Sequence, residues 1–340
     1  MKKKLIVLLS IVLAVFSLLV GCSQNTANEE TSTPAEKEGN QEEETKVSYP
    51  EKQIEIIVPF AAGGGTDAVG RVIAESLKEI LGQDVVVVNR EGGSGANGMQ
   101  EGLSSKPDGY TLTVVTREVT SLPLLGTAPF ETLDFKFVSN INIDPAVLVV
   151  SGKSEYKTVE DLVAAIKANP GKMKFAASAV PSYYGIGFSE AAGIDFTTVP
   201  YQGAAPAITE ILGGGADFGI YNPGEIKSFV DSGDLVPLAV MAEERFAGFP
   251  DAPTFKDKGI DVVSGTYRGI AVPPETPQEI VDILEKAIAD STQTEKFQQF
   301  MNNSFLGIGY MNSEEFTQYV KNDIEALTPI IEIAKSQGKK

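Results

Sequence analysis

The sequence of 340 residues contains no histidine, no tryptophan and one cysteine, Cys22. The absence of histidine excludes histidine general bases, Ser-His-Asp triads and most zinc sites. A single cysteine excludes an internal disulfide and a cysteine metal site. No serine has a histidine to activate it, and nothing in the sequence pairs Asp67 with a second carboxylate for acid–base work. We therefore expect no enzyme, such as a hydrolase, and no metal or cofactor.

Positive charge is scarce as well. Lysine and arginine together number 28 against 46 aspartates and glutamates, which gives a formal net charge of −18 at pH 7. This balance argues against nucleic acid or an anionic membrane surface as a partner. It does not exclude an anionic ligand, because local dipoles rather than the net charge decide what a pocket binds.

The N-terminus has the pattern of an export signal. Three lysines at positions 2–4 precede an apolar run from Leu5 to Val20, which at 16 residues is short for a membrane span of about 20 residues. The run ends in Leu19-Val20-Gly21-Cys22, which resembles the lipobox of bacterial lipoproteins, where the cysteine is lipidated and becomes the first mature residue. We expect residues 1–21 to be a signal peptide and Cys22 the lipidated residue. The alternative is a transmembrane anchor with a chance cysteine.

Residues 23–46 contain no large apolar residue and are rich in glutamate. Such a segment cannot bury enough apolar surface to offset its ordering entropy, and its glutamates repel one another. We expect residues 22–47 to form a disordered acidic tether that starts at the lipidated cysteine. This arrangement indicates a receptor held by its lipid at the outer face of the cell membrane.

The most informative segment is Pro59–Asp67, which contains Gly63-Gly64-Gly65. It follows an apolar run at Ile54–Val58 and precedes an amphipathic run at Ala68–Leu81, an order that predicts a strand, a glycine loop and a helix start. Glycines allow a tight turn, and the free N–H groups and positive dipole end of a helix start favour an anion such as a carboxylate. Nucleotide-binding loops fit this segment poorly, because Gly65 is followed by Thr66-Asp67 with no lysine, and Gly63-Gly64-Gly65 do not have the Gly-x-Gly-x-x-Gly spacing. An ordinary strand–helix turn remains the alternative.

The rest of the chain alternates short β-branched runs with amphipathic helical runs, which predicts an α/β fold with mostly parallel sheets. In such sheets ligands bind beyond the carboxyl ends of the strands, so the loops after the strands carry the expected site. The expected strands are 54–58, 85–88, 111–115, 147–150, 173–177, 196–199, 217–221 and 236–241.

Eight segments occur in an order that resembles one family, the substrate-binding receptors of tripartite tricarboxylate transporters, also called Bug-type receptors. The resemblance runs from about residue 49 to the C-terminus, and it is the order and spacing of the segments together that is specific. The segments are Tyr49–Ile54, Pro59–Asp67, Val88–Gly95, Pro107–Leu112, Val199–Gly203, Leu212–Asp217, Pro250–Thr254 and Pro273–Pro277.

The resemblance implies a two-domain fold like that of periplasmic binding proteins, in which two lobes close on a small carboxylate and the chain crosses the hinge twice. We expect one domain at 48–148 plus 267–340 and the other at 149–266. The resemblance further implies that the loops matching Phe60–Asp67 and Ser178–Tyr183 hold the ligand carboxylate, partly through water. The loops matching 201–204 and 221–222 would complete the pocket. The expected ligand-binding residues are Phe60, Ala61, Gly63, Gly64, Thr66, Asp67, Arg117, Ser178, Ser182, Tyr183, Tyr201, Gly203, Tyr221 and Asn222.

The chain departs from the family pattern in two loops. Many relatives carry a glycine-rich loop ending in histidine after the position of Ser178, whereas this chain continues Ala179-Val180-Pro181-Ser182-Tyr183-Tyr184, so the selectivity of its side chains must differ. Arg117 stands where relatives often have small polar residues. It could hold a second ligand carboxylate through its bidentate fork, or pair with an adjacent acid such as Glu118.

Three further side chains have open roles. Tyr201 and Tyr221 are expected as pocket walls, with plain hinge packing as the alternative. Arg268 is expected at the surface or at the hinge.

The resemblance implies an extracytoplasmic receptor, expected as a monomer, that delivers its ligand to a large and a small membrane subunit of a transporter. A receptor that signals to a membrane partner would use the same pocket and remains the alternative. The ligand is expected to be a di- or tricarboxylate, an acidic amino acid or an aromatic acid. Aromatic acids would have to stack on phenylalanine or tyrosine, since the chain has no tryptophan.

Overall fold

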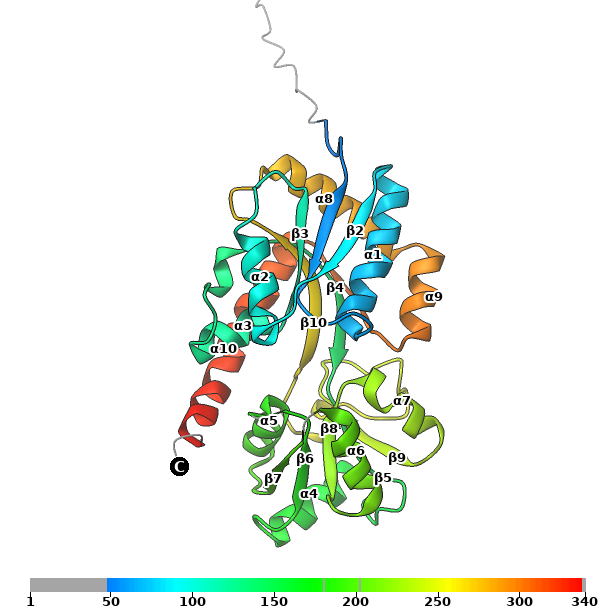
Figure 1. Ribbon diagram of the computed structural model, residues 1–340. Coiled ribbons are helices and arrows are strands. Elements are labelled where there is room, and N and C mark those ends of the chain that lie inside the picture. Colours follow the sequence, from blue (N-terminus) through cyan, green and yellow to red (C-terminus); the bar gives the residue numbers. More distant parts are fainter. Residues whose placement is uncertain (1–47, 180, 202, 338–340) are drawn as a thin grey trace, which may run out of the picture. The chain divides into compact units, whose positions relative to one another are not determined.

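The computed structural model describes residues 48–179, 181–201 and 203–337 (Figure 1). The signal peptide, the lipidated Cys22 and the tether predicted from the sequence lie outside these residues. None of the helices in the described part combines the length and hydrophobicity that crossing a bilayer requires.

The first lobe is built on a six-stranded sheet with the strand order β11-β4-β10-β3-β1-β2. Strand β1 is parallel to β2 and β3, while β10 is antiparallel to β3 and β4, and β11 is antiparallel to β4. The strands are β1 (Ile54–Val58), β2 (Val85–Asn89), β3 (Thr111–Thr116), β4 (Lys136–Pro145), β10 (Gly265–Val272) and β11 (Ile308–Met311). The helices are α1 (Gly65–Leu81), α2 (Ala96–Leu103), α3 (Glu118–Leu125), α8 (Gln278–Thr292), α9 (Glu295–Asn303) and α10 (Ser313–Gln337), with short 3-10 turns at Gly93–Gly95 and Thr132–Asp134.

Helices cover both faces of this sheet (Figure 1). One core joins the strands to the apolar faces of α1, α8 and α9, and the other joins them to α2, α3 and α10. Helix α1 forms as its sequence predicts, because Val69, Val72, Ile73 and Leu77 recur on one buried face. It ends at Gly82, which adopts the left-handed conformation with φ of +68°.

The second lobe is built on a five-stranded sheet with the order β7-β6-β8-β5-β9. In β5 the side chains of Val147 and Val149 join the core beneath α6 and α7, whereas Leu148 and Val150 join the core beneath α4 and α5. The strands are β5 (Val147–Ser151), β6 (Lys174–Ala177), β7 (Thr197–Pro200), β8 (Phe218–Tyr221) and β9 (Leu235–Val240). The helices are α4 (Val159–Ala168), α5 (Tyr183–Ala192), α6 (Ala204–Gly213) and α7 (Pro223–Asp231), with a 3-10 turn at Lys256–Lys258.

The two-lobed α/β fold is confirmed, but the expectation of mostly parallel sheets is wrong, because both sheets are mixed. In the second sheet β5 is antiparallel to β8 and β9, and β6 is parallel to β7 and β8. Strands β4, β10 and β11, whose pairings are antiparallel, were not expected from the sequence. Strand β4 leads out of the first lobe and β10 leads back into it, so these neighbouring strands must run in opposite directions.

The two crossing segments lie side by side. Ala146 N–H donates to Ser264 O at 2.9 Å, Met241 N–H donates to Ala146 O at 2.8 Å, and Ser264 N–H donates to Met241 O at 3.0 Å. Strand β5 begins at Val147 and β10 at Gly265. Each start lies two residues before the boundary expected from the sequence, and the division at 148/149 and 266/267 stays a prediction.

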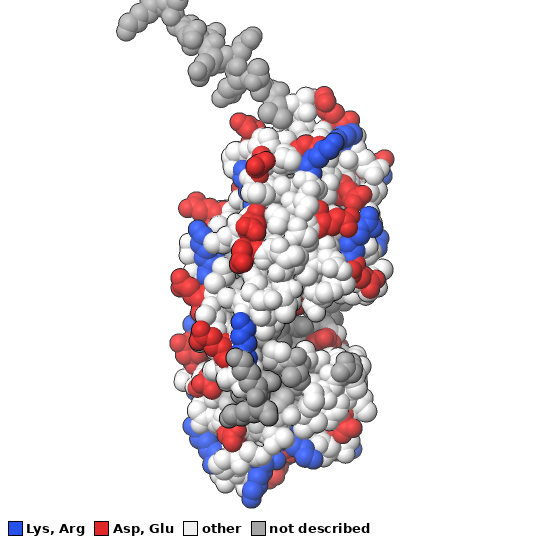
Figure 2. Space-filling view, turned by 60° about the vertical axis from the view of Figure 1, so that its left-hand side comes forward, with Lys and Arg blue, Asp and Glu red and all other residues white. Residues whose placement is uncertain are grey.

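Acidic and basic side chains are interspersed over the face of the molecule seen in Figure 2. Exposed ion pairs among the described residues include Arg90 with Glu101 and Lys296 with Glu75. Pairs as exposed as these contribute about 0–1 kcal/mol each, so the fold depends on its cores rather than on its surface charges.

Candidate functional site

The loop between β1 and α1 is held in shape by Asp67. The Oδ2 atom of Asp67 accepts hydrogen bonds from Gly63 N–H at 2.8 Å and Arg71 Nε at 2.9 Å, and its Oδ1 accepts one from Asn89 Nδ2 at 2.9 Å. Burial by itself would raise the pKa of this carboxyl, but these hydrogen bonds and the charge of Arg71 outweigh it and lower the pKa to about 2. Asp67 is therefore ionised at neutral pH and acts on the loop rather than on a ligand.

The outer part of this loop is available for binding. Ala61, Gly63 and Gly64 are exposed, and Gly63 takes a φ of +85° that favours glycine. Helix α1 starts after Gly64 without a side-chain cap. The first N–H groups of this helix, which has 17 residues, therefore face the loop with their partial positive charge.

A cleft of 360 Å³ opens at this helix start, between residues of the two lobes. Its first side comes from the β1–α1 loop, from β4 and β10 and from the segment after α9, and its second side comes from the start of α7. Its lining residues are Gly63, Gly64, Gly65, Ala68, Asp144, Asn222, Gly224, Glu225, Arg268, Ser304 and Leu306.

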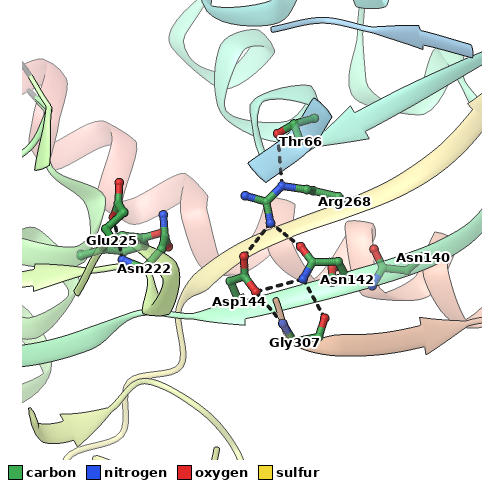
Figure 3. Close-up of polar contacts among 9 residues, drawn as sticks. Thr66, Asn140, Asn142, Asp144, Asn222, Glu225, Arg268 and Gly307 are labelled. Atoms are coloured by element: carbon green, nitrogen blue, oxygen red, sulfur yellow. Dashed lines mark hydrogen bonds and ion pairs between the residues drawn. The ribbon is translucent and has the colours of Figure 1, made fainter. Parts of the chain in front are cut away.

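Arg268 of β10 is the cation of this cleft (Figure 3). It is only 8 % exposed, and its Nε donates to Thr66 Oγ1 at 3.1 Å. Its Nη1 donates to Asn142 Oδ1 and to Asp144 Oδ2, the latter at 2.6 Å. Its Nη2 donates to no acceptor among the described residues and lies 3.0 Å from the position that a Cβ on Gly65 would take. The buried guanidinium thus keeps one amino group free at the start of α1.

Asp144 is fully engaged in orienting this guanidinium. Its Oδ1 accepts from Asn142 Nδ2 at 2.9 Å and from Gly307 N–H at 2.8 Å, while its Oδ2 accepts from Arg268. A buried arginine is stable only when it is paired, and Asp144 is itself 2 % exposed. The ion pair with Asp144 therefore fixes the guanidinium of Arg268 in one orientation in the wall of the cleft.

The second side of the cleft is formed by Asn222, Gly224 and Glu225, and Tyr184 of α5 contacts it through Asn222. Asn222 N–H donates to Glu225 Oε2 at 2.8 Å, and the Tyr184 hydroxyl donates to Asn222 Oδ1 at 3.1 Å. The pKa of the Glu225 carboxyl is raised, chiefly by the loss of surrounding solvent and also by Asp144, although Asn222 N–H and Arg268 oppose the rise. Burial likewise raises the pKa of Tyr184. Glu225 is exposed on this side of the cleft, whereas Tyr184 is half-buried beside it.

The expectations for Arg117 need correction. Its side chain does not line the cleft and does not pair with Glu118. Its Nη2 donates to Asp323 Oδ1 of α10 at 2.9 Å, and its Nη1 donates to Ser264 Oγ at 2.7 Å and to Gly265 O at 3.0 Å. Arg117 therefore connects α10 to the second crossing segment, and both of its amino groups are engaged there.

Tyr221, expected as a pocket wall, is a core residue. It is fully buried beneath α6 and α7, and its hydroxyl donates to Ala176 O at 2.8 Å. Tyr201 is half-buried and packs against the edge of the same core. Its backbone N–H donates to Ala177 O at 2.9 Å.

The other predicted residues of the second lobe form two adjoining loops that do not line this cleft in the described part of the chain. Ser182 caps α5 by accepting from Gly185 N–H at 3.3 Å. Gly203 N–H donates to Ser178 O at 3.1 Å, and Gly203 takes a φ of +102° at the start of α6. Burial raises the pKa of Tyr183, which is half-buried.

Of the predicted residues, Gly63, Gly64 and Asn222 line the cleft, Thr66 supports Arg268, and Asp67 shapes the loop. Phe60 is half-buried, and its carbonyl accepts from Asn89 Nδ2 at 2.9 Å. Asp144, Glu225 and Tyr184 were not expected at the site from the sequence, and Arg268 was expected at the surface or the hinge. A single arginine within the apolar run Gly265–Val272 was the available signal, since a charge in a buried strand needs a partner.

Two α/β lobes joined by two adjacent crossing segments, with an uncapped helix start and a buried cation at a cleft between them, define a two-lobed solute-binding protein. The family model described as "Tripartite tricarboxylate transporter family receptor" matches residues 69–335. The chain belongs to this receptor family, as the resemblance implied, and the family is one of receptors rather than of enzymes.

Similar proteins agree with this assignment. The chain is 33 % identical over 255 residues to protein BugT of Bordetella pertussis, which covers 73 % of this chain and 78 % of BugT. A TctC solute-binding protein from Polaromonas, solved without ligand, superposes with a TM-score of 0.78 at 32 % identity over 84 % of this chain and 99 % of that chain. The R. palustris protein Rpa4515, solved with adipate, gives a TM-score of 0.71 at 26 % identity over 84 % and 98 % of the two chains.

Proposed function

We propose that this protein captures a small organic carboxylate between its lobes and delivers it to the large and small membrane subunits of a tripartite tricarboxylate-type transporter. The observation that carries the proposal is the free Nη2 of Arg268 beside the uncapped start of α1. A carboxylate at this point would accept from the guanidinium and from backbone N–H groups at once. The adipate in the related R. palustris structure supports the same ligand class.

The geometry gives this wall of the cleft a defined binding direction. Thr66, Asn142 and Asp144 hold the guanidinium plane, so little conformational entropy is lost when a ligand binds to Nη2. Asp67 holds the loop in the conformation that exposes Gly63 and Gly64. The protein would bind and release its ligand without changing it, as a monomer and without a cofactor.

The N-terminal sequence completes the proposal. The signal peptide at 1–21 would export the chain, the lipid on Cys22 would hold it at the outer face of the cell membrane, and the segment 22–47 would act as the tether. These residues lie outside the described structure, so the proposal rests on their sequence. Cys22→Ser should move the protein from the membrane fraction to the soluble fraction, and an unchanged distribution would contradict the lipid anchor.

The ligand class can be tested by isothermal titration of the purified protein with succinate, adipate, citrate, aspartate and benzoate, with glucose as the neutral comparison. Binding confined to acids is expected. Gly65→Ala should weaken it roughly tenfold or more, about 1.4 kcal/mol, because the new Cβ would lie 3.0 Å from Arg268 Nη2.

Gly213→Ala is the matched control. Gly213 lies in α6 away from the cleft, and its Cβ would meet nothing within 4 Å. This variant should bind as the unsubstituted protein does. Binding of glucose alone, or equal affinities of the two alanine variants, would contradict the proposal.

A further inference from the structure

We infer that the ligand of this cleft is an amino acid, with its carboxylate at Arg268 and its ammonium group at Glu225. This inference rests on the proposed function and narrows it from carboxylates in general to carboxylates that also carry a cation. Three features of the cleft support it: the charge of Arg268 is already balanced by Asp144, one carboxylate oxygen of Glu225 is free, and Glu225 lies across the cleft from Arg268.

The charge of Arg268 is balanced before a ligand arrives. The guanidinium forms a buried ion pair with Asp144, at 2.6 Å between Nη1 and Oδ2, with side-chain exposures of 10 % and 2 %. Glu225 then adds a second acid to the lining without adding a second cation. A ligand carrying two or three carboxylates would therefore increase a negative charge that the cleft already has.

Glu225 has one oxygen in use and one available. Its Oε2 accepts from Asn222 N–H, whereas none of the described residues donates to its Oε1. Glu225 is exposed, so its Oε1 is accessible to a ligand, and a charged donor would form the stronger hydrogen bond with it.

Glu225 lies across the cleft from the start of α1. It belongs to the first turn of α7 in the second lobe, whereas Arg268 and Gly65 belong to the first, and Figure 3 shows Glu225 and Asn222 on one side and Arg268 and Asp144 on the other. The charges of Arg268 and Asp144 are close enough to affect the pKa of Glu225. One small molecule bound at Arg268 can thus reach Glu225 with a second group.

The raised pKa of the Glu225 carboxyl also favours a cationic group of the ligand as its partner. The loss of solvent and the charge of Asp144 raise it, and a ligand carboxylate beside Glu225 would raise it further. An ammonium group would instead stabilise the ionised carboxyl. A hydroxyl could also donate to Oε1, but it would leave the charge uncompensated.

The test compares acids that differ only at one carbon, using the full chain and isothermal titration. Each set contains an amino acid, the matching hydroxy acid and the matching unsubstituted acid. The sets are alanine, lactate and propionate; aspartate, malate and succinate; glutamate, 2-hydroxyglutarate and glutarate; leucine, 2-hydroxy-4-methylpentanoate and 4-methylpentanoate; phenylalanine, phenyllactate and 3-phenylpropionate. In at least one set the amino acid should bind tenfold or more tightly than both of its partners.

Glu225→Gln should remove that preference, because the amide keeps an oxygen for Asn222 N–H and loses the charge. Its affinity for the unsubstituted acid should not fall. Glu315→Gln is the matched control, since Glu315 accepts from Asn312 N–H at 3.0 Å at the start of α10 in the same Asn-x-x-Glu arrangement and lies outside the cleft. This control should keep the preference of the unsubstituted protein.

The outcomes separate the inference from the function on which it rests. Binding of unsubstituted or hydroxy acids in preference to every amino acid, or a preference that survives Glu225→Gln, would overturn the inference and leave the carboxylate receptor standing. Binding of citrate alone would do the same. Binding of no acid at all would overturn both.

Discussion

Removing the partner of a buried arginine gives the sharpest test of how the first lobe holds the second crossing segment. Arg117 and Asp323 have side chains that are each 11 % exposed, and Arg117 also binds Ser264 Oγ and Gly265 O. The three variants of interest are Asp323→Leu, Arg117→Met and the double variant that carries both changes.

The two single changes should differ in size. Burial opposes the charge on Arg117, but the charge of Asp323 outweighs it, so the pKa of Arg117 is raised and the side chain stays charged. Asp323→Leu leaves a buried guanidinium that cannot lose its proton, and we expect it to cost about 3–5 kcal/mol of unfolding free energy. Arg117→Met leaves a carboxyl, which unlike a guanidinium has an accessible neutral form, so its cost should be smaller, about 2–3 kcal/mol.

The double variant should recover most of this loss. Arg117 Nε and Asp323 Oδ2 are buried and have no partner among the described residues, so the pair carries a desolvation cost that apolar side chains would remove. We expect the double variant to lie within about 1 kcal/mol of the unsubstituted protein. It should also bind ligand normally, because Arg117 does not line the cleft.

Equilibrium urea unfolding at neutral pH measures these differences, and the melting temperature should fall by about 6–20 °C in Asp323→Leu. A cost below about 1 kcal/mol for Asp323→Leu would show that solvent reaches the pair. A double variant as unstable as the sum of the single ones would refute the coupling. Loss of ligand affinity in a stable double variant would return Arg117 to the binding site.

Two further predictions follow from single side chains. Asp67→Asn should lose about 1–2 kcal/mol of unfolding free energy at neutral pH. Because the pKa of Asp67 in the folded protein is lowered to about 2, this difference in unfolding free energy should be complete above about pH 4 and disappear toward pH 2. Unfolding curves measured at several pH values test it, and a difference that does not change with pH would contradict it. Tyr184→Phe should weaken ligand binding, because it removes the hydroxyl that orients Asn222. Tyr221→Phe should instead cost about 1 kcal/mol of stability through its lost hydrogen bond to Ala176 O and leave the ligand affinity unchanged. Titration of ligand into both variants distinguishes these effects, and the reverse pattern would show that the ligand binds elsewhere.

The sequence predicted best what short-range chemistry determines. The β1–α1 loop could be predicted because its glycines, its preceding strand and its following helix lie within one segment, and Asp67 reaches Gly63 over only four residues. The mixed direction of the sheets could not be predicted in this way. A strand buried on both faces has the same apolar run whether its neighbours are parallel or antiparallel, as Val147–Ser151 shows in β5.

The two buried arginines show why the cleft itself needed the structure. Arg117 directly follows β3, whereas Arg268 lies within β10. The sequence favoured Arg117 because it follows an expected strand, whereas the strand of Arg268 was not recognised. In the sheet Arg268 pairs with Thr116, the residue immediately before Arg117. Arg268 stays in its strand and extends toward Thr66, a contact across 202 residues of sequence. Arg117 turns into α3, and its guanidinium goes to α10.

The offset of one residue between Arg117 and Thr116, which pairs with Arg268, thus decides which arginine is available to a ligand and which stabilises the fold. Thr116 is the last residue of β3, and the next residue already has helical backbone angles, with φ of −55°. The side chain of Arg117 therefore does not lie on the face of the sheet where Arg268 contacts Thr66. Each guanidinium is buried and needs an acidic partner, which is Asp144 for Arg268 and Asp323 for Arg117. Only Arg268 keeps an amino group without an acceptor, and this difference makes it the residue on which a carboxylate would bind.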